Sequence, residues 1–354
     1  MQCHVLSVAA IAFALAACGG ANAPAASAAP ETLASPDASA NASSAPSTTA
    51  RDRDDVAEGT LAVKAENWEQ ARVAFETAIR KSPRRADAHY YLGLVMEKTG
   101  DPASAEAHYK KALSISPDLH EAAANLMALY IEARRFDEAV AVANEVLARN
   151  RERPEGANVP IHAESANVWL NLAVALSGKG EVDAASRTFE NAIRLSPNDA
   201  RFYLAYAHHL IGIKKNDLAI VNLKHAEGLA RDDPAMLGSI GFEFRTARAV
   251  PECIAAFDKA IALKDNADFR TNRALCKYAA KDKAGAMADL KVATQAEPTF
   301  APAHYWLGSW LHNDGKFNEA LVEYGAYLKA APSGPMAKAA EAKSKLAKEK
   351  KKPR

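Results

Sequence analysis

The chain has 354 residues and a formal net charge of +1, because 44 Lys and Arg residues balance 43 Asp and Glu residues. This balance excludes a strongly basic nucleic-acid-binding protein, so we expect no nucleic-acid partner. The one long apolar run, residues 5–17, is too short to span a membrane, because a spanning helix needs roughly 20 apolar residues. A run of this length predicts an export signal over residues 1–17.

The run ends in Leu15, Ala16, Ala17 and Cys18, and these four residues resemble the lipobox of bacterial lipoproteins. The resemblance implies cleavage before Cys18 and acylation of both its thiol and the new amino terminus. Several acyl chains together hold a protein firmly on a membrane, whereas a single chain binds only marginally. Gly19 follows the cysteine in place of Asp, which in enterobacterial lipoproteins is the pattern of the outer membrane. The resemblance therefore implies a lipid anchor (palmitate or a similar acyl group) at the outer membrane, facing the periplasm.

Residues 18–51 are almost wholly Ala, Ser, Pro, Thr, Gly and Asn, and between residues 19 and 50 only Glu31 and Asp37 are charged. Such a stretch has too few large apolar side chains to offset the entropy cost of ordering. We therefore expect a disordered tether between the membrane and the remainder of the chain.

Residues 52–334 contain a repeat of nearly constant length, in which three alignment columns stand out. The columns fit a pair of amphipathic helices, because two antiparallel helices that cross closely leave room only for Gly, Ala or Ser. Proline near the end of most repeats fits the end of the second helix, since proline cannot continue a helix interior. The eight repeats begin at Asp52, Ala86, His120, Ala166, Ala200, Pro234, Ala267 and Ala301.

The three columns are named here by the size of their residues. The first small column is Gly59, Gly93, Met127, Ala173, Ala207, Gly241, Ala274 and Gly308. The second small column, small in every repeat, is Ala71, Ala105, Ala139, Ala185, Ala219, Cys253, Ala286 and Ala320. The large column is Phe75, Tyr109, Ala143, Phe189, Leu223, Phe257, Leu290 and Tyr324.

This pattern resembles the tetratricopeptide repeat, as in "YYLGLVMEKTGDPASAEAHYKKALSISP" at residues 90–117. The resemblance implies an all-α solenoid of about eight helix-turn-helix repeats in a right-handed superhelix. Glu58 and Arg273 stand where the other repeats have Leu, Ile or Tyr, and Lys277 follows Arg273 one turn later, which predicts that the seventh repeat is the weakest packed. Residues 151–162 extend the connection between the third and fourth repeats. They are either a tolerated surface insertion or an added contact element.

The end of the chain, residues 335–354, holds eight basic and two acidic residues. A run of like charges is usually solvated, so we expect a basic, partly helical end cap. Contact with an anionic surface is the functional alternative for this basic tail.

We find no catalytic constellation in the sequence: it has no HExxH motif, no glycine-rich phosphate loop and no nucleophile elbow. His89 and His304 share a column with Trp169 and Tyr203, so we expect packed side chains there rather than metal ligands. We therefore predict that the chain is not an enzyme and needs neither a cofactor nor a metal.

Cys253 and Cys276 are expected on neighbouring helices of the sixth and seventh repeats. An oxidising compartment permits a disulfide between them. Cys253 also occupies the second small column, where a buried free thiol fits as well, and two free thiols are the interpretation we favour.

The first helix of each repeat lines the concave surface in the tetratricopeptide family, so the resemblance implies a protein partner in that groove. Three asparagines in one column resemble, incompletely, the ladder by which O-linked glycosyltransferase repeats hold a peptide backbone. An amide can donate and accept hydrogen bonds at once, and aromatic residues on the same surface can serve as anchors. The predicted peptide-binding residues are Tyr90, Tyr91, Asn125, Asn171, His208, Phe242, Asn272, Tyr305 and Trp306.

Two functions fit these features. The first is a scaffold lipoprotein for assembly of an envelope machine, since type IV pilus pilotins and adaptors for peptidoglycan hydrolases also combine a lipobox with tetratricopeptide repeats. The alternative is a substrate-presenting subunit whose catalytic partner is a separate chain. Both functions need only a repeat groove, and we favour the first.

Overall fold

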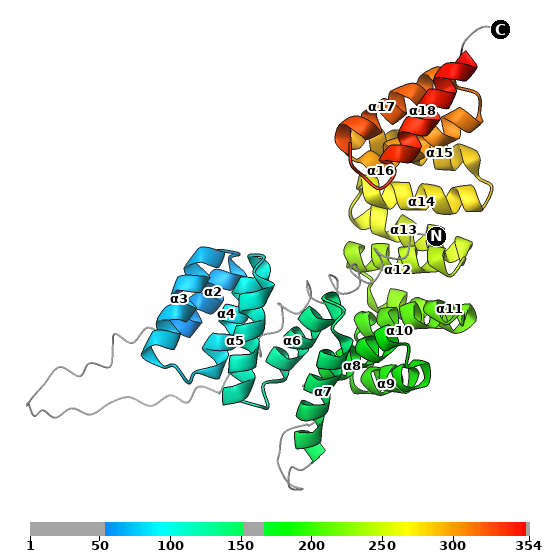
Figure 1. The fold of residues 1–354 in the computed structure, drawn as a ribbon. Helices are drawn as coiled ribbons and strands as arrows, with labels where there is room; N and C mark the ends of the chain where they lie inside the picture. Colours follow the sequence, from blue (N-terminus) through cyan, green and yellow to red (C-terminus); the bar gives the residue numbers. More distant parts are fainter. Residues whose placement is uncertain (1–53, 152–165, 352–354) are drawn as a thin grey trace, which may run out of the picture. The chain divides into compact units, whose positions relative to one another are not determined.

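The structure, a computed structural model, describes residues 54–151 and 166–351. Within these ranges it consists of helices α2 to α18 and contains no strand (Figure 1). The chain divides into two compact units, Met1–Leu195 and Ser196–Arg354, which are termed the N-terminal and C-terminal units. The predicted signal peptide, Cys18, the tether and nearly all of the 151–162 insertion lie outside the described residues.

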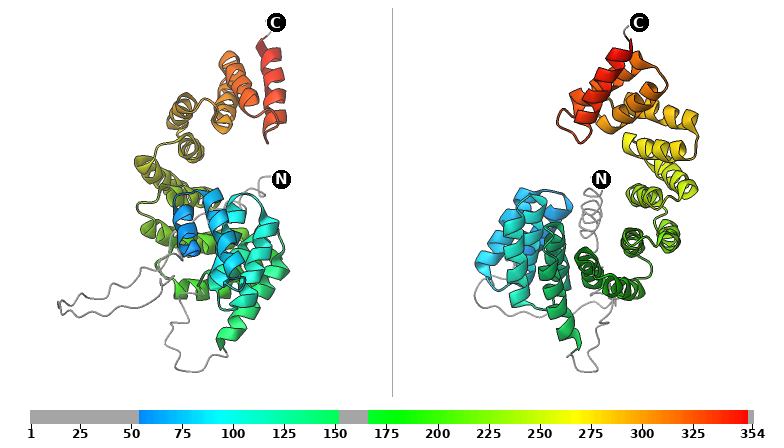
Figure 2. Two further views of the ribbon diagram at one scale, coloured as in Figure 1. Left: turned by 90° about the vertical axis from the view of Figure 1, so that its left-hand side faces the viewer. Right: turned by 45° about the vertical axis from the view of Figure 1, so that its right-hand side comes forward.

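Successive helices pack as helix-turn-helix pairs, which confirms the predicted all-α repeat architecture, and Figure 2 shows the pairs of the C-terminal unit stacked one upon the next. The pairs of the N-terminal unit are α2 (Asp55–Lys64) with α3 (Trp68–Lys81), α4 (Ala86–Lys98) with α5 (Pro102–Ile115), α6 (His120–Glu132) with α7 (Phe136–Arg151), and α8 (Ala166–Lys179) with α9 (Val182–Leu195). Those of the C-terminal unit are α10 (Ala200–Gly212) with α11 (Asn216–Leu229), α12 (Pro234–Thr246) with α13 (Val250–Leu263), α14 (Ala267–Ala279) with α15 (Lys283–Ala296), and α16 (Ala301–Asn313) with α17 (Phe317–Ala330), followed by α18 (Ala337–Lys351).

The turn inside every pair contains one residue in the left-handed backbone region. In three turns it is a glycine, as at Gly100, where φ is 84°. In the other five it is a residue with a side chain, for which the left-handed conformation costs roughly 1–2 kcal/mol. These five residues are Glu66, Arg134, Lys214, Arg248 and Lys281. The left-handed residue allows the next N–H to bond the end of the first helix. After α4, the N–H of Asp101 donates to the Met96 carbonyl at 2.8 Å.

The small and large columns are buried and share one space in each pair. Every residue of the second small column and of the large column is at most 1% exposed. A Cβ atom added at Gly59 would lie 2.5 Å from the Phe75 ring. One added at Gly241 would lie 2.8 Å from the Phe257 ring, also well inside the contact distance of two carbon atoms. The ring on the second helix therefore lies where a side chain of the first helix would otherwise be.

The third pair reverses this division of space. Met127 on α6 takes the place of the glycine, and Ala143 on α7 takes the place of the ring. Both side chains are fully buried. The total volume between the two helices is thus conserved while its source changes sides, as expected for a closely packed interior.

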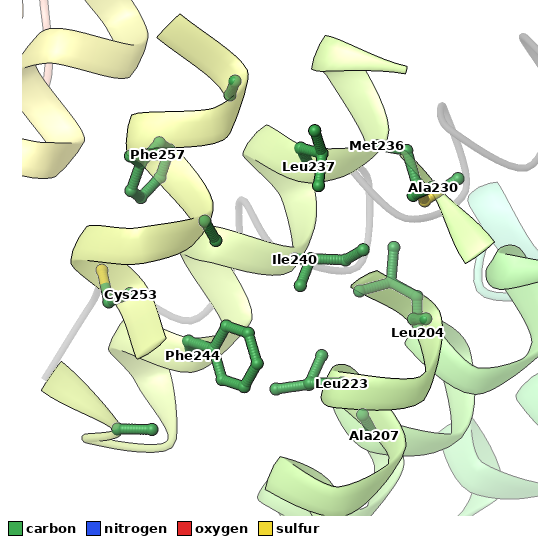
Figure 3. Packing of buried hydrophobic residues seen from close by; sticks show 14 of the residues in the cluster. Leu204, Ala207, Leu223, Ala230, Met236, Leu237, Ile240, Phe244, Cys253 and Phe257 are labelled. Atoms are coloured by element: carbon green, nitrogen blue, oxygen red, sulfur yellow. The ribbon is translucent and has the colours of Figure 1, made fainter. Parts of the chain in front are cut away.

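The pairs also share a core with their neighbours inside each unit. Figure 3 shows Leu223 of α11 and Phe244 of α12 pointing toward one another, so that the fifth and sixth pairs close a common cluster. Ile240 of α12 belongs to the same cluster and is fully buried. A single pair therefore does not complete its own core, which is the stabilising principle of a solenoid.

Cys253 of α13 and Cys276 of α14 form a disulfide in the structure, with Cα atoms 6.2 Å apart. This differs from the expectation of two free thiols. The packing of α13 against α14 places the two Cα atoms within the usual range for a disulfide, which the small column alone did not indicate.

The seventh pair is joined by a buried ionic cluster, where the sequence predicts weak packing. The Asp289 carboxylate of α15 is 4% exposed and accepts hydrogen bonds from two nitrogens of Arg273. Lys277 Nζ lies 2.9 Å from the same carboxylate, and Arg273 also bonds Asp258 of α13 at 2.7 Å. Burial raises the pKa of Asp289, but the bonds from Arg273 and Lys277 outweigh it and hold the pKa below its usual value. The basic residues are therefore neutralised inside the pair.

Most of the basic tail is helix α18, which packs against α17 and α16. Ala340 and Ala347 are fully buried, so one face of this helix is part of the core rather than solvated. Lys343 Nζ donates to Ser309 Oγ on α16, and desolvation lowers the pKa of Lys343. The tail thus covers the end of the eighth pair.

The shared space between the columns predicts a compensating pair of substitutions. Gly241→Ala should destabilise the sixth pair by about 1–3 kcal/mol, because the new methyl group meets the Phe257 ring. Phe257→Leu should be destabilising alone, yet it should rescue Gly241→Ala, since Ala207 with Leu223 already fills the fifth pair in this way. Amide hydrogen exchange of α12 and α13 in the two single variants and the double variant measures the coupling. Strictly additive effects would contradict the shared space.

Candidate protein-binding surfaces

The first helices of successive pairs contact one another and form one face in each unit, termed here the first-helix face. In the N-terminal unit it consists of α2, α4, α6 and α8, and in the C-terminal unit of α10, α12, α14 and α16. Tyr90, Tyr91, Asn125 and Asn171 lie on the helices of the N-terminal face, and His208, Phe242, Asn272, Tyr305 and Trp306 lie on those of the C-terminal face. The predicted residues therefore form two separate sets.

Tyr90, Tyr91 and Asn125 come together on the N-terminal face. The ring centres of Tyr90 and Tyr91 are 5.0 Å apart, and the Tyr91 ring stacks on Phe75 at 5.3 Å. Asn125 Nδ2 of α6 donates to the Tyr109 hydroxyl at 3.3 Å and so links the third pair to the second. All three predicted residues are half-buried, so part of each side chain is exposed to a partner.

The same face is acidic around these aromatic rings. The Tyr109 hydroxyl donates to Glu97 Oε2 at 2.9 Å, and burial raises the pKa of Glu97. Burial also raises the pKa of Tyr90 well above its usual range, and the Glu121 carboxylate adds to this shift. The tyrosine hydroxyls therefore stay protonated, and the face offers neutral donors beside carboxylate acceptors.

Asn171 does not belong to the exposed part of this face, contrary to the sequence prediction. Its side chain is 7% exposed, and its Nδ2 donates to the backbone carbonyl of Ala124 at 2.8 Å. The amide therefore joins α8 to α6 inside the N-terminal unit, and a partner has no access to it.

On the C-terminal face, His208 contacts a buried carboxylate and Phe242 contacts a guanidinium group. His208 Nδ1 lies 3.0 Å from Glu243 Oε1, and Glu243 is only 3% exposed. The guanidinium carbon of Arg245 lies 4.7 Å from the centre of the Phe242 ring, a cation–π contact. The sequence prediction missed Glu243. Other repeats have apolar residues such as Val95 in the same column, so a charged residue there was a signal that could have been used.

Asn272 bonds within its own helix. Its Nδ2 donates to the backbone carbonyl and to Oδ1 of Asp268, both at 3.0 Å. Asn125 bonds a tyrosine, Asn171 a backbone carbonyl of another helix, and Asn272 its own helix. The three amides are therefore not equivalent, and the predicted asparagine ladder is not formed.

Tyr305 is 7% exposed because α18 covers it, with Lys343 Nζ 5.4 Å from the ring centre. The prediction that Tyr305 is available to a partner is therefore wrong. Trp306 stays half-buried, with its ring 6.4 Å from that of Trp310. Tyr278, which the sequence prediction missed, stacks on Trp310 at 4.4 Å and is 41% exposed. Trp306 and Tyr278 are the aromatic surface of the seventh and eighth pairs.

Across residues 54–151 and 166–351, no group of three or more His, Cys, Asp or Glu side chains is arranged to hold a metal ion. The helices in these ranges also include none that combines the length and the apolar character needed to cross a bilayer.

Three family models, each described as a tetratricopeptide repeat, match residues 56–120, 97–159 and 166–199. These matches agree with the helix pairs from α2 to α9, and the fold of the described residues is that of a tetratricopeptide repeat solenoid. Among solved structures, yeast Tom70 aligns over 95% of this chain and 69% of its own chain, with a TM-score of 0.58 and 16% identity, a likeness of fold alone. A structure of Pseudomonas aeruginosa pilF aligns over 61% of this chain and 94% of its own, with a TM-score of 0.47 and 19% identity.

Two curated relatives match part of the chain. Cellulose synthase operon protein C of Xanthomonas axonopodis pv. citri is 32% identical over 119 residues, which are 33% of this chain and 8% of that protein. Type IV pilus assembly protein PilF of Pseudomonas aeruginosa is 26% identical over 141 residues, which are 40% of this chain and 52% of that protein. The matched segments are therefore less than two thirds of either relative.

The different bonds of the asparagines predict different effects of substitution. Asn171→Ala should destabilise the N-terminal unit by about 1 kcal/mol, because it removes a buried donor. Asn272→Ala should change the stability of the C-terminal unit by less than about 0.5 kcal/mol, because its amide is partly exposed. Hydrogen exchange of α6 and α8, and of α14, reports the two effects separately. Equal destabilisation by both substitutions would refute this distinction.

Proposed function

We propose that this chain is a non-catalytic adaptor that captures a segment of a partner protein on its first-helix faces during assembly of a cell-envelope machine. The observation that carries the proposal is that Tyr91, Phe242 and Trp306 stay partly exposed after the helices have packed. Aromatic side chains beside polar groups are typical anchors of protein interfaces. Tetratricopeptide repeats supply such faces without any catalytic group.

Two relatives support the cell envelope as the setting. PilF is a type IV pilus assembly protein, and the other relative is a protein of a cellulose synthase operon. We propose an adaptor of the pilotin type or of the type that serves peptidoglycan hydrolases. The similarity to the cellulose synthase operon protein favours a second candidate, a subunit that presents substrate to a separate catalytic chain. The identity of the captured partner distinguishes the two.

The anchor that we propose is an acyl-modified Cys18 at the outer membrane, which lies outside the described residues. It is supported by the four residues that end in Cys18 and by the short apolar run before them. The stretch of residues 18–51, as a flexible coil, has a reach on the order of 30 Å. A tether of that reach lets the first-helix faces search for a partner away from the lipid surface.

Cys18→Ser should release the protein from the membrane fraction, because it removes the acylated thiol. Fractionation of cells labelled with palmitate measures both the label and the location. The parent chain with Cys3→Ser serves as the control, since Cys3 precedes the predicted cleavage site. A labelled, membrane-bound Cys18→Ser protein would rule out this anchor.

Replacing Tyr91 and Phe242 together by Ala should weaken capture of the partner about tenfold or more, because interface anchors contribute most of the binding energy. Affinity capture from a membrane extract of the native cells, quantified by mass spectrometry, provides the measurement. The matched control replaces Val73 of α3 and Val322 of α17 by Ala, which are 49% and 69% exposed on second helices.

The control protein should capture the same partner as the parent chain. Circular dichroism verifies that both double variants are folded. Loss of the partner from the control protein, or its full retention by the Tyr91 and Phe242 variant, is incompatible with binding on the first-helix faces.

A further inference from the structure

The second helix pair brings two histidines into contact. His89 of α4 and His108 of α5 lie with their Nδ1 atoms 3.3 Å apart. Two other pairs hold opposite charges at the equivalent positions, with His304 beside Glu323 in the eighth pair and Arg270 beside Asp289 in the seventh. In the sixth pair the equivalent residues are Leu237 and Ala256, both fully buried. The second pair is thus the one in which two groups of the same basic type meet.

The backbone fixes the proton of His89. Its Nε2 lies 3.1 Å from the carbonyl oxygen of Pro83, which can only accept a hydrogen bond, so Nε2 carries the proton. The Nδ1 of neutral His89 is then a lone pair directed at His108. His304 has the same bond from Nε2 to the Pro298 carbonyl, at 3.0 Å. A ring nitrogen held by a carbonyl in this way leaves the other nitrogen oriented as a metal ligand.

The surroundings of His108 disfavour its protonated form. Burial lowers the pKa of His108, and the neighbouring His89 lowers it further. The Glu76 carboxylate of α3 also acts on His108, in the opposite direction, and it accepts a hydrogen bond from Arg72 at 2.8 Å. In the eighth pair, by contrast, Glu323 raises the pKa of His304. Neutral imidazole is the form that binds metal.

We propose that His89 and His108 bind one Zn²⁺ or a similar divalent transition-metal ion through their two Nδ1 atoms. Two nitrogens at 2.0–2.1 Å from a tetrahedral zinc ion are about 3.3–3.4 Å apart, which matches the separation in this pair. Water completes the coordination. This site is independent of the proposed adaptor function.

Metal binding exchanges a hydrogen bond for two coordinate bonds. The proton on Nδ1 of neutral His108 moves through solvent to Nε2, so that the Nδ1 lone pair faces the metal, and no net proton is released at neutral pH. Protons compete with the metal ion for the imidazole nitrogens, so the affinity falls as the pH is lowered. The bound ion joins α4 to α5 and slows their local opening.

Isothermal titration with zinc chloride tests the site on the full chain, purified without a histidine tag and treated with a chelator. The parent chain should bind one zinc ion. His108→Gln should bind it at least about tenfold more weakly, because its amide keeps a donor for His89 Nδ1 but is a poor metal ligand. His304→Gln, at the equivalent position of the eighth pair, is the matched control and should bind like the parent chain.

A second variant and a spectroscopic measurement complete this test. His89→Gln, whose amide retains a donor for the Pro83 carbonyl, replaces His108→Gln if the latter is not folded by circular dichroism. Copper(II) electron paramagnetic resonance should show two coordinating nitrogens in the parent chain and fewer in either variant. The proposal is overturned if the parent chain binds no zinc, if the pair variants bind it as tightly as the parent chain, or if His304→Gln loses as much affinity as they do.

Discussion

The two helices within each pair approach closely, and this close approach determines which residues fit between them. A ring on the second helix occupies the space that a side chain on the first helix would need, as at Gly241 and Phe257. Met127 with Ala143 fills the same space from the opposite helix. Because interiors are closely packed, this single condition explains both the glycines and the aromatic residues of the repeat.

Several polar side chains inside the array have hydrogen-bond partners within the chain, since a buried polar group without a partner is costly. Asn171 bonds a backbone carbonyl, and Asp289 is surrounded by basic side chains. His89 and His304 both bond the carbonyl of a proline that precedes their own helix. These four polar residues thus bond within the chain, whereas Tyr91 and Trp306 on the first-helix faces are left partly exposed. This division is the physical basis for locating a partner on those faces.

The helix pairs and their core columns could be predicted from the sequence because they depend on spacing, which is visible in one repeat and tested by the others. The hydrogen-bond partners of individual polar groups could not be predicted in this way. Asn171 meets Ala124 only because α8 packs against α6, and a column of asparagines does not contain that information. Tyr305 is covered by a helix whose composition is that of a solvated tail. Arg273 alone suggested weak packing, because the repeat pattern does not show that it pairs with the buried Asp289 of the neighbouring helix.

Site-specific photo-crosslinking in living cells tests whether a partner binds the first-helix faces. A photoreactive amino acid is placed in turn at Tyr91 and Phe242 on first helices, and at Val73 and Val322 on second helices. We expect a crosslink to the same envelope protein from Tyr91 or Phe242 and none from Val73 or Val322. A crosslink to that protein from the second-helix positions alone would exclude binding on the first-helix faces.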